Sequence, residues 1–336
     1  MVDKFYKNTP LIIAEIGSVH DGSFGNAIKL IEAASKAGAD VVKFQTHIAE
    51  AETLKEAPSP SYFSLEPRYD YFLRTSFTLD QWFQLKNACI KNNVLFLSSP
   101  FSLEAVDLLE KIDTNFYKIP SGEVTNTPLL EKISKTNKTV FLSSGMSSYI
   151  ELDQAINFFN NSNDLVVMQC TSEYPCPPTR VGLNVLKEIK DKYNCKVGFS
   201  DHTLGFAASF AAAALGANYI EKHFTFSRLM YGSDAKNSME PNEFSIFCQG
   251  IKDIWEMLDN PVDKNSIEQY SEMKMIFQKS IVLKDDFEVG HIISFEDLAF
   301  KKPGNGSPSN SWKDIIGKKL VNKIKKNQIL KKEDFI

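Results

Sequence analysis

The sequence predicts the α/β class, with a closed parallel (β/α)8 barrel followed by a small β-rich domain. Apolar runs alternate with helical periodicity about eight times in a chain of 336 residues, which is long enough for such a barrel. The runs are apolar throughout, as expected of strands that are buried on both faces. After residue 275 the pattern changes to short strand-like pieces and turns. We therefore expect a barrel at 1–259, a linker at 260–275 and a second domain at 276–336.

The predicted strands are eight apolar runs, several of which end in polar residues. PLIIAEIG opens the series, and CKVGFSDH and ANYIEKHF close it. In chain order, we expect strands at 10–17, 39–46, 94–100, 115–122, 138–145, 164–171, 195–202 and 217–224.

Segments with helical spacing of their apolar residues lie between these runs. The first, at 24–39, has Ile28, Ile31 and Ala34 at helical spacing and stops at Gly38. Residues 51–76 have no clear period and contain three prolines, so a long loop is expected there. The remaining helices are expected at 78–93, 103–112, 126–135, 149–160, 183–193, 204–217 and 241–258.

The predicted second domain differs from the barrel in pattern and in charge. KSIVL and ISFEDLAF read as short strands, Pro-Gly-Asn-Gly at 303–306 as a turn, and Trp312–Ile316 as a short helix. Residues 276–336 carry a net charge of +4, and the rest of the chain carries −8. The two parts could attract each other across an interface, although drift in composition explains the difference equally well.

The composition excludes several classes of protein. Apolar residues make up 43% of the chain, and no apolar run approaches the ~20 residues that span a bilayer. Residues 1–10 are polar and contain lysine, unlike a signal peptide, so we expect a cytosolic protein with no membrane partner. The net charge of −4 argues against nucleic-acid binding. The five cysteines lack C-x-x-C spacing, which favours reduced thiols over disulfides.

Polar residues gather where the predicted strands end, which is the end at which such barrels carry their active sites. Their number favours a shared pocket over a set of independent strand-end caps. They are Glu15, Lys43, Gln45, Ser98, Ser99, Lys118, Ser121, Glu123, Ser143, Ser144, Thr171, His202, Glu221 and His223.

Two of the five histidines close the last two predicted strands. His202 and His223 lie 21 positions apart in the sequence, but parallel neighbouring strands would bring them together. Neutral imidazoles in such a place can hold a divalent metal ion. The alternative is a pair of partly buried histidines that are hydrogen-bonded to the backbone.

Two lysines, Lys43 and Lys118, are expected at neighbouring strand ends beside several serines. Ammonium and hydroxyl groups together suit an anion that carries phosphate. The alternative is a set of salt bridges to the carboxylates at Glu15, Glu123, Glu221 and Asp234. A metal ion beside the lysines would polarise a carbonyl oxygen, which predicts a phosphorylated molecule reacting with a carbonyl compound. A Schiff-base aldolase is a further possibility, in which the metal would be redundant.

Nine short motifs then match one known family in order. They are AEIGSVHDGS (14–23), VVKFQTHIAE (41–50), LSSPF (97–101), YKIPSGE (117–123), SSGM (143–146), TSEYP (171–175), GFSDHT (198–203), IEKHF (220–224) and SMEP (238–241). With KKPGNG at 301–306, the chain resembles the sialic acid synthase family, the bacterial nonulosonic acid synthases, over nearly its whole length. The last domain resembles the antifreeze-like (SAF) domain of that family, a β-clip fold.

The resemblance implies an enzyme that condenses phosphoenolpyruvate with an N-acylated mannosamine-type sugar and releases phosphate. The product would be a nine-carbon nonulosonic acid, with N-acetylneuraminate synthase as the first expectation. The alternatives are a legionaminate or pseudaminate synthase that acts on a diacetamido-trideoxyhexose, and a non-catalytic sugar-binding protein on the same scaffold.

The resemblance also implies roles for individual residues. His202 and His223 would bind Mn²⁺, with Mg²⁺ or Co²⁺ as alternatives, and Glu221 would orient the water on the metal. Sugar contacts would come from Glu15, Gln45, Glu123 and Asp234, with Ser172 and Lys302 also at the substrates. Phosphoenolpyruvate would be bound by Lys43, Ser99, Lys118, Ser121, Ser143, Tyr174 and Ser200. A homodimer is implied in which each SAF domain covers the active site of the partner subunit.

Three positions depart from the family pattern: Val19 and Ser172 replace amide or hydroxyl residues, and Lys302 replaces an arginine that contacts the N-acyl group. Lysine does not reproduce a bidentate guanidinium contact. The segments THIAE and SMEP resemble N-acetylneuraminate synthases, whereas KIPSGE and SEYP resemble legionaminic acid synthases, so the sequence leaves the sugar open.

Overall fold

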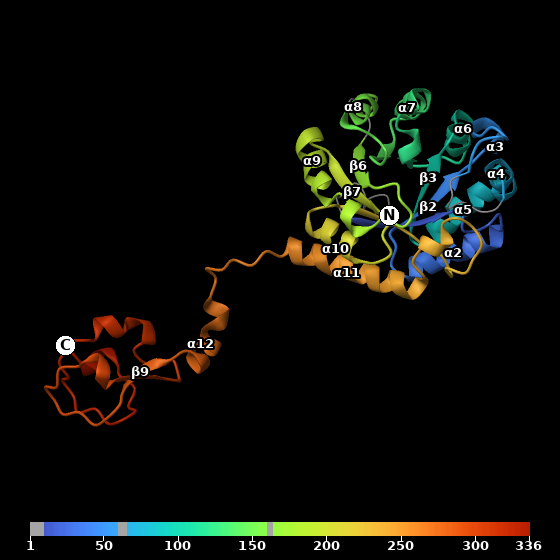
Figure 1. Ribbon diagram of the computed structural model, residues 1–336. Coiled ribbons are helices and arrows are strands. Elements are labelled where there is room, and N and C mark those ends of the chain that lie inside the picture. The colour runs from blue at the N-terminus through green and yellow to red at the C-terminus, as the bar shows by residue number, and fades with distance from the viewer. Residues whose placement is uncertain (1–9, 60–65, 160–163) are drawn as a thin grey trace. The chain divides into compact units, whose positions relative to one another are not determined.

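The structure is a computed structural model that describes residues 10–59, 66–159 and 164–336 (Figure 1). The chain divides into two compact units, residues 1–260 and residues 261–336, and each is described by itself. The first unit is a closed barrel of eight parallel strands, in which β1 pairs with both β2 and β8. The predicted α/β class and barrel are therefore confirmed.

The strands follow the predicted apolar runs closely, and several are shorter at their ends. They are β1 Leu11–Gly17, β2 Val41–Thr46, β3 Leu95–Pro100, β4 Phe116–Ile119, β5 Thr139–Ser143, β6 Leu165–Cys170, β7 Lys196–Asp201 and β8 Tyr219–His223. His202 falls one residue beyond β7, whereas His223 is the last residue of β8.

Helices surround the barrel, one after most strands (Figure 1). Several begin at sequence signals: Thr78 and Gln81 form a capping box, as do Ser148 and Glu151. The last residue of the helix predicted at 149–160 lies outside the described residues. The helices are α2 Phe24–Lys36, α5 Leu79–Lys91, α6 Leu103–Lys111, α7 Thr127–Ser134, α8 Tyr149–Asn157, α9 Leu183–Tyr193, α10 Ala207–Ala214 and α11 Pro241–Asp259.

The long loop predicted at 51–76 is wrong in part, because one short helix lies within it and another ends at its start. These are α3 Ala49–Glu52 and α4 Arg68–Thr75. Pro67 stands at the N-cap of α4, where its missing N–H costs nothing, so this proline begins a helix. Tyr71 and Phe72 are buried against Ala49 in a small separate core. Because Tyr71 and Phe72 are adjacent in sequence, they do not show the spacing of apolar residues that indicates a helix. Pro60 lies outside the described residues.

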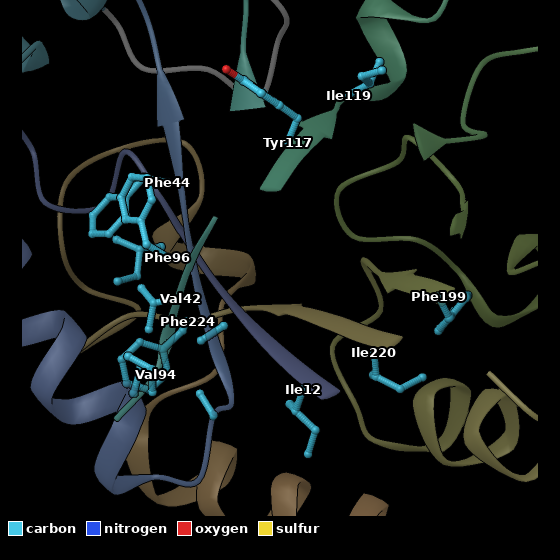
Figure 2. Close-up of a cluster of buried hydrophobic side chains, with 14 of the residues drawn as sticks. Ile12, Val42, Phe44, Val94, Phe96, Tyr117, Ile119, Phe199, Ile220 and Phe224 are labelled. Atoms are coloured by element: carbon cyan, nitrogen blue, oxygen red, sulfur yellow. The ribbon is translucent and has the colours of Figure 1, made fainter. Parts of the chain in front are cut away.

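The strands present two different faces, because successive side chains on a strand point in opposite directions. One set packs against the helices, as Figure 2 shows for Val42, Phe44, Phe96 and Ile220. The other set fills the barrel with a second apolar cluster: Leu11, Ile13, Val41, Leu95, Leu97, Phe116, Phe141, Val166, Met168 and Tyr219. Six of the polar strand-end residues continue this second set two positions further along their strands: Glu15, Lys43, Ser99, Lys118, Ser143 and Glu221. The period of two therefore places them on the inward face.

The second unit is a small β-rich fold with its own core. Strand β9 Ser280–Leu283 pairs antiparallel with β10 Leu298–Lys301. The helix predicted near Trp312 is a 3₁₀ helix at Ser309–Asp314. Helix α12 Ser271–Phe277 begins within the segment predicted as linker and ends two residues beyond it. The core residues are Ile281, Leu283, Ile293, Leu298, Ile315, Leu320, Ile324 and Leu330.

Among the described residues, none of the helices has the length and apolar character needed to cross a membrane.

Candidate active site

A buried carboxylate, Glu221 on β8, joins the two lysines of the predicted site. Its Oε2 lies 2.9 Å from Lys118 Nζ, and its Oε1 lies 3.7 Å from Lys43 Nζ. The lysines come from β2 and β4, which are separated by β3, so the prediction that they lie on neighbouring strands is wrong. Lys43 also pairs with Glu15 at 3.0 Å and lies 3.5 Å from the hydroxyl of Ser99.

The charges in this cluster shift one another's protonation. Burial would raise the pKa of Glu221, but the ammonium groups of Lys118 and Lys43 outweigh burial and hold that pKa below its usual range. Burial would lower the pKa of Lys43, but Glu15 and Glu221 raise it overall. Burial lowers the pKa of Lys118, and the charge on Lys43 adds to this against the pull of Glu221. The two lysines therefore share a small buried volume with the carboxylates of Glu15 and Glu221.

The two histidines face each other beside this cluster, with ring centroids 5.7 Å apart. The Nδ1 of His202 lies 2.7 Å from the backbone carbonyl of Thr171. A carbonyl only accepts, so Nδ1 carries the hydrogen and Nε2 keeps its lone pair. That Nε2 lies 3.1 Å from the hydroxyl of Tyr174. Burial, followed by the charge of His223, lowers the pKa of His202 to about 3, so its ring is neutral at neutral pH.

These histidines fit one side of a metal site. The Nδ1 of His223 is buried and has no hydrogen-bond partner among the described residues, and the carbonyl of Thr171 orients His202 as second-sphere groups do. Within the described ranges, no group of three or more His, Cys, Asp or Glu side chains is placed to hold a metal ion. A divalent ion here would take two imidazoles from the chain and its other ligands from water or substrate, as open catalytic sites do.

Ser200 on β7 links the lysine cluster to the histidine pair. Its hydroxyl donates to Glu221 Oε1 at 2.8 Å and lies 3.5 Å from the Nε2 of His202. The predicted anion-binding and metal-binding groups thus form one continuous polar layer at the barrel mouth.

Glu15, Gln45 and Asp234 form a second group around a glycine. The Nε2 of Gln45 donates to Glu15 Oε1 at 2.7 Å. A Cβ on Gly17 would lie 2.8 Å from Asp234 Oδ2, 3.2 Å from Gln45 Nε2 and 3.4 Å from Glu15 Oε1. Gly17, at φ +51°, therefore lets these three side chains converge.

A third group lies around Gly145, at the ends of β5 and β6. A Cβ there would lie 2.5 Å from Ser121 Oγ, 2.6 Å from Ser172 Oγ and 2.7 Å from Cys170 Sγ. The missing side chain leaves a cradle lined by hydroxyls, and Ser143, two positions beyond the inward-facing Phe141, is buried at the same end of β5.

Among the described residues, two of the hollows at this end of the barrel are lined by predicted site residues. One, of about 160 Å³, is lined by Gln45, Tyr174, His223 and Asp234 together with residues of α4. The other, of about 550 Å³, is lined by Ser144, Gly145, Cys170 and Ser172.

Two further predicted residues have other surroundings. Glu123 lies on a 3₁₀ turn at Ser121–Glu123, where it accepts a hydrogen bond from Asn126. Burial raises its pKa, and the carboxylate of Glu52 adds to this rise. Lys302 belongs to the second unit, where its ammonium lies 4.9 Å from the ring centroid of Phe277.

Sequence reasoning missed three residues that line or support the smaller hollow: His47, Glu52 and Arg68. Arg68 comes from α4, in the segment expected to be a loop, and its guanidinium lies 5.3 Å from the ring centroid of Phe72. His47 carried a usable signal. It stands two positions beyond Gln45, which itself stands two beyond Lys43, so it continues the inward period of β2.

Comparison with known proteins identifies the family of this chain. The NeuB family model matches residues 30–263, and the SAF domain model matches residues 278–336. The chain is 37% identical over 330 residues to the N,N'-diacetyllegionaminic acid synthase of Campylobacter jejuni, covering 96% of this chain and 98% of that protein. It is 30% identical over 331 residues to a pseudaminic acid synthase of the same species, with 96% of each chain covered.

A solved structure shares the fold as well. The chain resembles the crystal structure of an N-acetylneuraminic acid synthetase from Leptospira borgpetersenii in complex with citrate, with a TM-score of 0.70 and 28% identity. The match covers 80% of this chain and 92% of that one. Matched by the family model over most of its barrel, the chain is an enzyme of the NeuB family, the family of sialic, legionaminic and pseudaminic acid synthases.

Proposed function

We propose that this enzyme condenses phosphoenolpyruvate with an N-acylated mannosamine-type sugar to form a nonulosonic acid and inorganic phosphate. The observation that carries the proposal is the continuous polar layer in which Ser200 joins the Lys43–Glu221–Lys118 cluster to the histidine pair. One side of this layer suits a highly charged anion, and the other suits the oxygen of a carbonyl compound.

Phosphoenolpyruvate carries a phosphate and a carboxylate, so it needs several cations and hydrogen-bond donors. Lys43 and Lys118 supply two buried ammonium groups. The cradle at Gly145 adds the hydroxyls of Ser121 and Ser172. In our proposal Ser99, Ser143, Tyr174 and Ser200 complete this part of the site.

In the proposed reaction, the electron pair of the C2–C3 double bond of phosphoenolpyruvate forms a bond from C3 to the aldehyde carbon of the open-chain sugar, and the aldehyde oxygen takes up a proton to become a hydroxyl. The oxygen of a water molecule adds at C2, the bond between C2 and the phosphate oxygen breaks, and C2 becomes a ketone carbon. Of the two protons of that water, one balances the proton on the new hydroxyl and the other leaves with phosphate. Glu15, Gln45, Glu123 and Asp234 contact the sugar in this proposal. The convergence of three of them around Gly17 supports it.

A divalent metal ion, Mn²⁺ with Mg²⁺ or Co²⁺ as alternatives, belongs to the same proposal. His202, through Nε2, and His223 would hold it, while the carbonyl of Thr171 fixes the ring of His202. When bound, such an ion supplies Lewis acidity for a carbonyl oxygen. Glu221 already contacts two lysines and Ser200, and its role at a metal-bound water remains a prediction.

Two sugars are candidates. The THIAE and SMEP segments favour N-acetylmannosamine, with N-acetylneuraminate as the product. The 37% identity to a legionaminic acid synthase favours a diacetamido-trideoxyhexose, and legionaminate or pseudaminate would then be the product. We further propose a cytoplasmic homodimer in which the SAF domain, through Lys302, covers the active site of the partner subunit. The net charges of +4 and −8 on the two parts of the chain support that association.

A phosphate-release assay tests the proposal. The enzyme is supplied with phosphoenolpyruvate, Mn²⁺ and a panel of N-acyl hexosamines, and product masses identify the sugar. We expect release only with an accepted sugar and at least a ~10³-fold loss in His202→Ala. Lys135→Met, which removes an exposed lysine, is the control and keeps the wild-type rate. Wild-type enzyme that releases no phosphate with any sugar would contradict the proposal, as would a fully active His202→Ala.

A further inference from the structure

A continuous chain of polar contacts runs from the short helix α3 into the barrel mouth. Glu52 Oε1 on α3 lies 2.7 Å from the Nδ1 of His47. The other ring nitrogen, Nε2, lies 3.0 Å from the side-chain oxygen of Gln45. The amide nitrogen of Gln45 then donates to Glu15 at 2.7 Å, and Glu15 pairs with Lys43 at 3.0 Å.

The donors and acceptors in this series of contacts determine which atom of the Gln45 amide faces His47. Gln45 donates through Nε2 to a carboxylate, so its oxygen is the atom that faces His47. An amide oxygen only accepts, so His47 must carry a hydrogen on Nε2. If the amide of Gln45 were turned over, its oxygen would face the Glu15 carboxylate, and two acceptors would repel each other. The N–H of His47 therefore selects the one orientation of Gln45 that serves Glu15.

The ring of His47 is held firmly enough to act in this way. It is stacked between Phe72 and Phe101, with ring centroids 3.6 Å and 4.2 Å away. The side chains of His47 and Glu52 are only 5% and 4% exposed, so their hydrogen bonds are shielded from competition by water.

We propose that His47, anchored by Glu52 and the two phenylalanines, is a positioning residue that holds the amide of Gln45 toward Glu15. The inference rests on the proposed function, in which Gln45 and Glu15 contact the sugar. Loss of the His47 contact would leave a buried amide oxygen unpaired and free the amide to rotate. The cost would fall on sugar binding and not on phosphoenolpyruvate binding.

A matched pair of substitutions separates positioning from packing. His47→Gln places an amide N–H near the former Nε2 and can still donate to Gln45. His47→Asn places its amide near the former Nδ1, so it keeps the contact with Glu52 and loses the contact with Gln45. Glu50→Gln, at an exposed position on the same helix, is the control for a lost charge and leaves the kinetics unchanged.

We expect His47→Asn to raise the KM for the sugar about tenfold, and His47→Gln to stay within about threefold of wild type. The KM for phosphoenolpyruvate stays unchanged in both variants. A role in packing alone predicts equal effects of the two substitutions, and that result would overturn the proposal.

Two further measurements need no turnover. Crystal structures of the variants should keep the 2.7 Å contact between Gln45 and Glu15 in His47→Gln and lose it in His47→Asn. If His47→Asn does not fold, ¹H–¹⁵N spectra of wild-type protein with ¹⁵N-labelled histidines show which ring nitrogen of His47 carries a hydrogen. The signals of His47 are identified by their absence from the spectrum of His47→Gln. A hydrogen on Nε2 supports the inference, and a bare Nε2 overturns it. A wild type that lacks synthase activity would remove the proposed function, while these two results would still test the contact itself.

Discussion

At the scale of single residues, the site depends on a glycine that leaves space for polar side chains and on lysines that are already paired with carboxylates. Glu221 is shared by two lysines and a serine, so neither ammonium stands without a counter-charge before an anion binds. Gly145 contributes by having no side chain, because three polar side-chain atoms converge on the space that a Cβ would fill.

Gly145→Ala tests that cradle. Its added methyl group would lie 2.5–2.7 Å from three side-chain atoms and push the serine hydroxyls apart. We expect the KM for phosphoenolpyruvate to rise about tenfold with a smaller change in the KM for the sugar. Steady-state kinetics with each substrate varied in turn measure this split. Gly25→Ala, where a Cβ meets nothing within 4 Å, is the control. An unchanged KM for phosphoenolpyruvate in Gly145→Ala would place the anion elsewhere.

His20 gives the protein a pH-dependent stability. Burial, with a smaller effect of the charge of His47, lowers the pKa of His20 from 6.5 to about 4. Between pH 6.5 and pH 4, His20 is therefore protonated in the unfolded protein and neutral in the folded protein. The free energy of unfolding falls as the pH drops through this range. This residue should account for about 3 kcal/mol of that loss.

Urea unfolding of wild type and His20→Asn, from pH 7 to pH 4, measures the contribution. The introduced amide oxygen can still accept from the backbone N–H of Gly22, as Nδ1 does at 3.1 Å. We expect a flatter pH dependence in the variant. Parallel curves for the two proteins would show that His20 titrates normally in the folded state.

At the scale of elements, the short helix α4 lines the smaller hollow and supports His47. Phe72 is the link, since it is buried beside Ala49 and stacks on the imidazole of His47. An element of eight residues has little stability of its own, so it depends on such contacts.

Phe72→Ala should therefore loosen α3 and α4 before the rest of the barrel. We expect a loss of about 3 kcal/mol in unfolding free energy and early proteolysis within residues 49–75. Leu73→Ala, on the same helix but 51% exposed, should change neither. Equal resistance of the two variants to protease would mean that α4 is held by other contacts.

The barrel was predictable because its strands are long apolar runs and its helices carry capping signals such as Thr78 and Ser148. The positions of Lys43, Lys118, Glu221 and His223 where predicted parallel strands end also predicted that they would gather at one end of the barrel. Helix α4 was not predictable, because its buried Tyr71 and Phe72 are adjacent and three prolines precede them within 15 residues. The separation of Lys43 from Lys118 by β3, and the contact of His47 with Glu52, depend on closure of the barrel and on tertiary packing.

At the scale of the whole molecule, we propose a dimer in which the basic SAF domain of one subunit meets the acidic barrel of the other. Lys302 would then reach the active site of the partner subunit. Each unit has its own buried core, which is a requirement for a domain that folds independently.

Subunit mixing tests this arrangement. We expect His202→Ala and Lys302→Ala homodimers each to be impaired, and mixed dimers to regain activity. In a mixed dimer, one barrel with an intact His202 would meet an intact Lys302 from the other chain. Activity after mixing should exceed the sum of the separate proteins. Strictly additive activity, with subunit exchange verified by mass, would show that Lys302 acts within its own chain or away from the site.

The central claim is that one barrel mouth joins a phosphoenolpyruvate carbon to a sugar aldehyde, and labelled substrates test it most directly. The enzyme is given [3-¹³C]phosphoenolpyruvate and the accepted sugar labelled with ¹³C at its aldehyde carbon. We predict a nonulosonic acid whose two labelled carbons show one-bond ¹³C–¹³C coupling, formed in step with inorganic phosphate. Phosphate released together with free pyruvate, and no coupled product, would contradict the account.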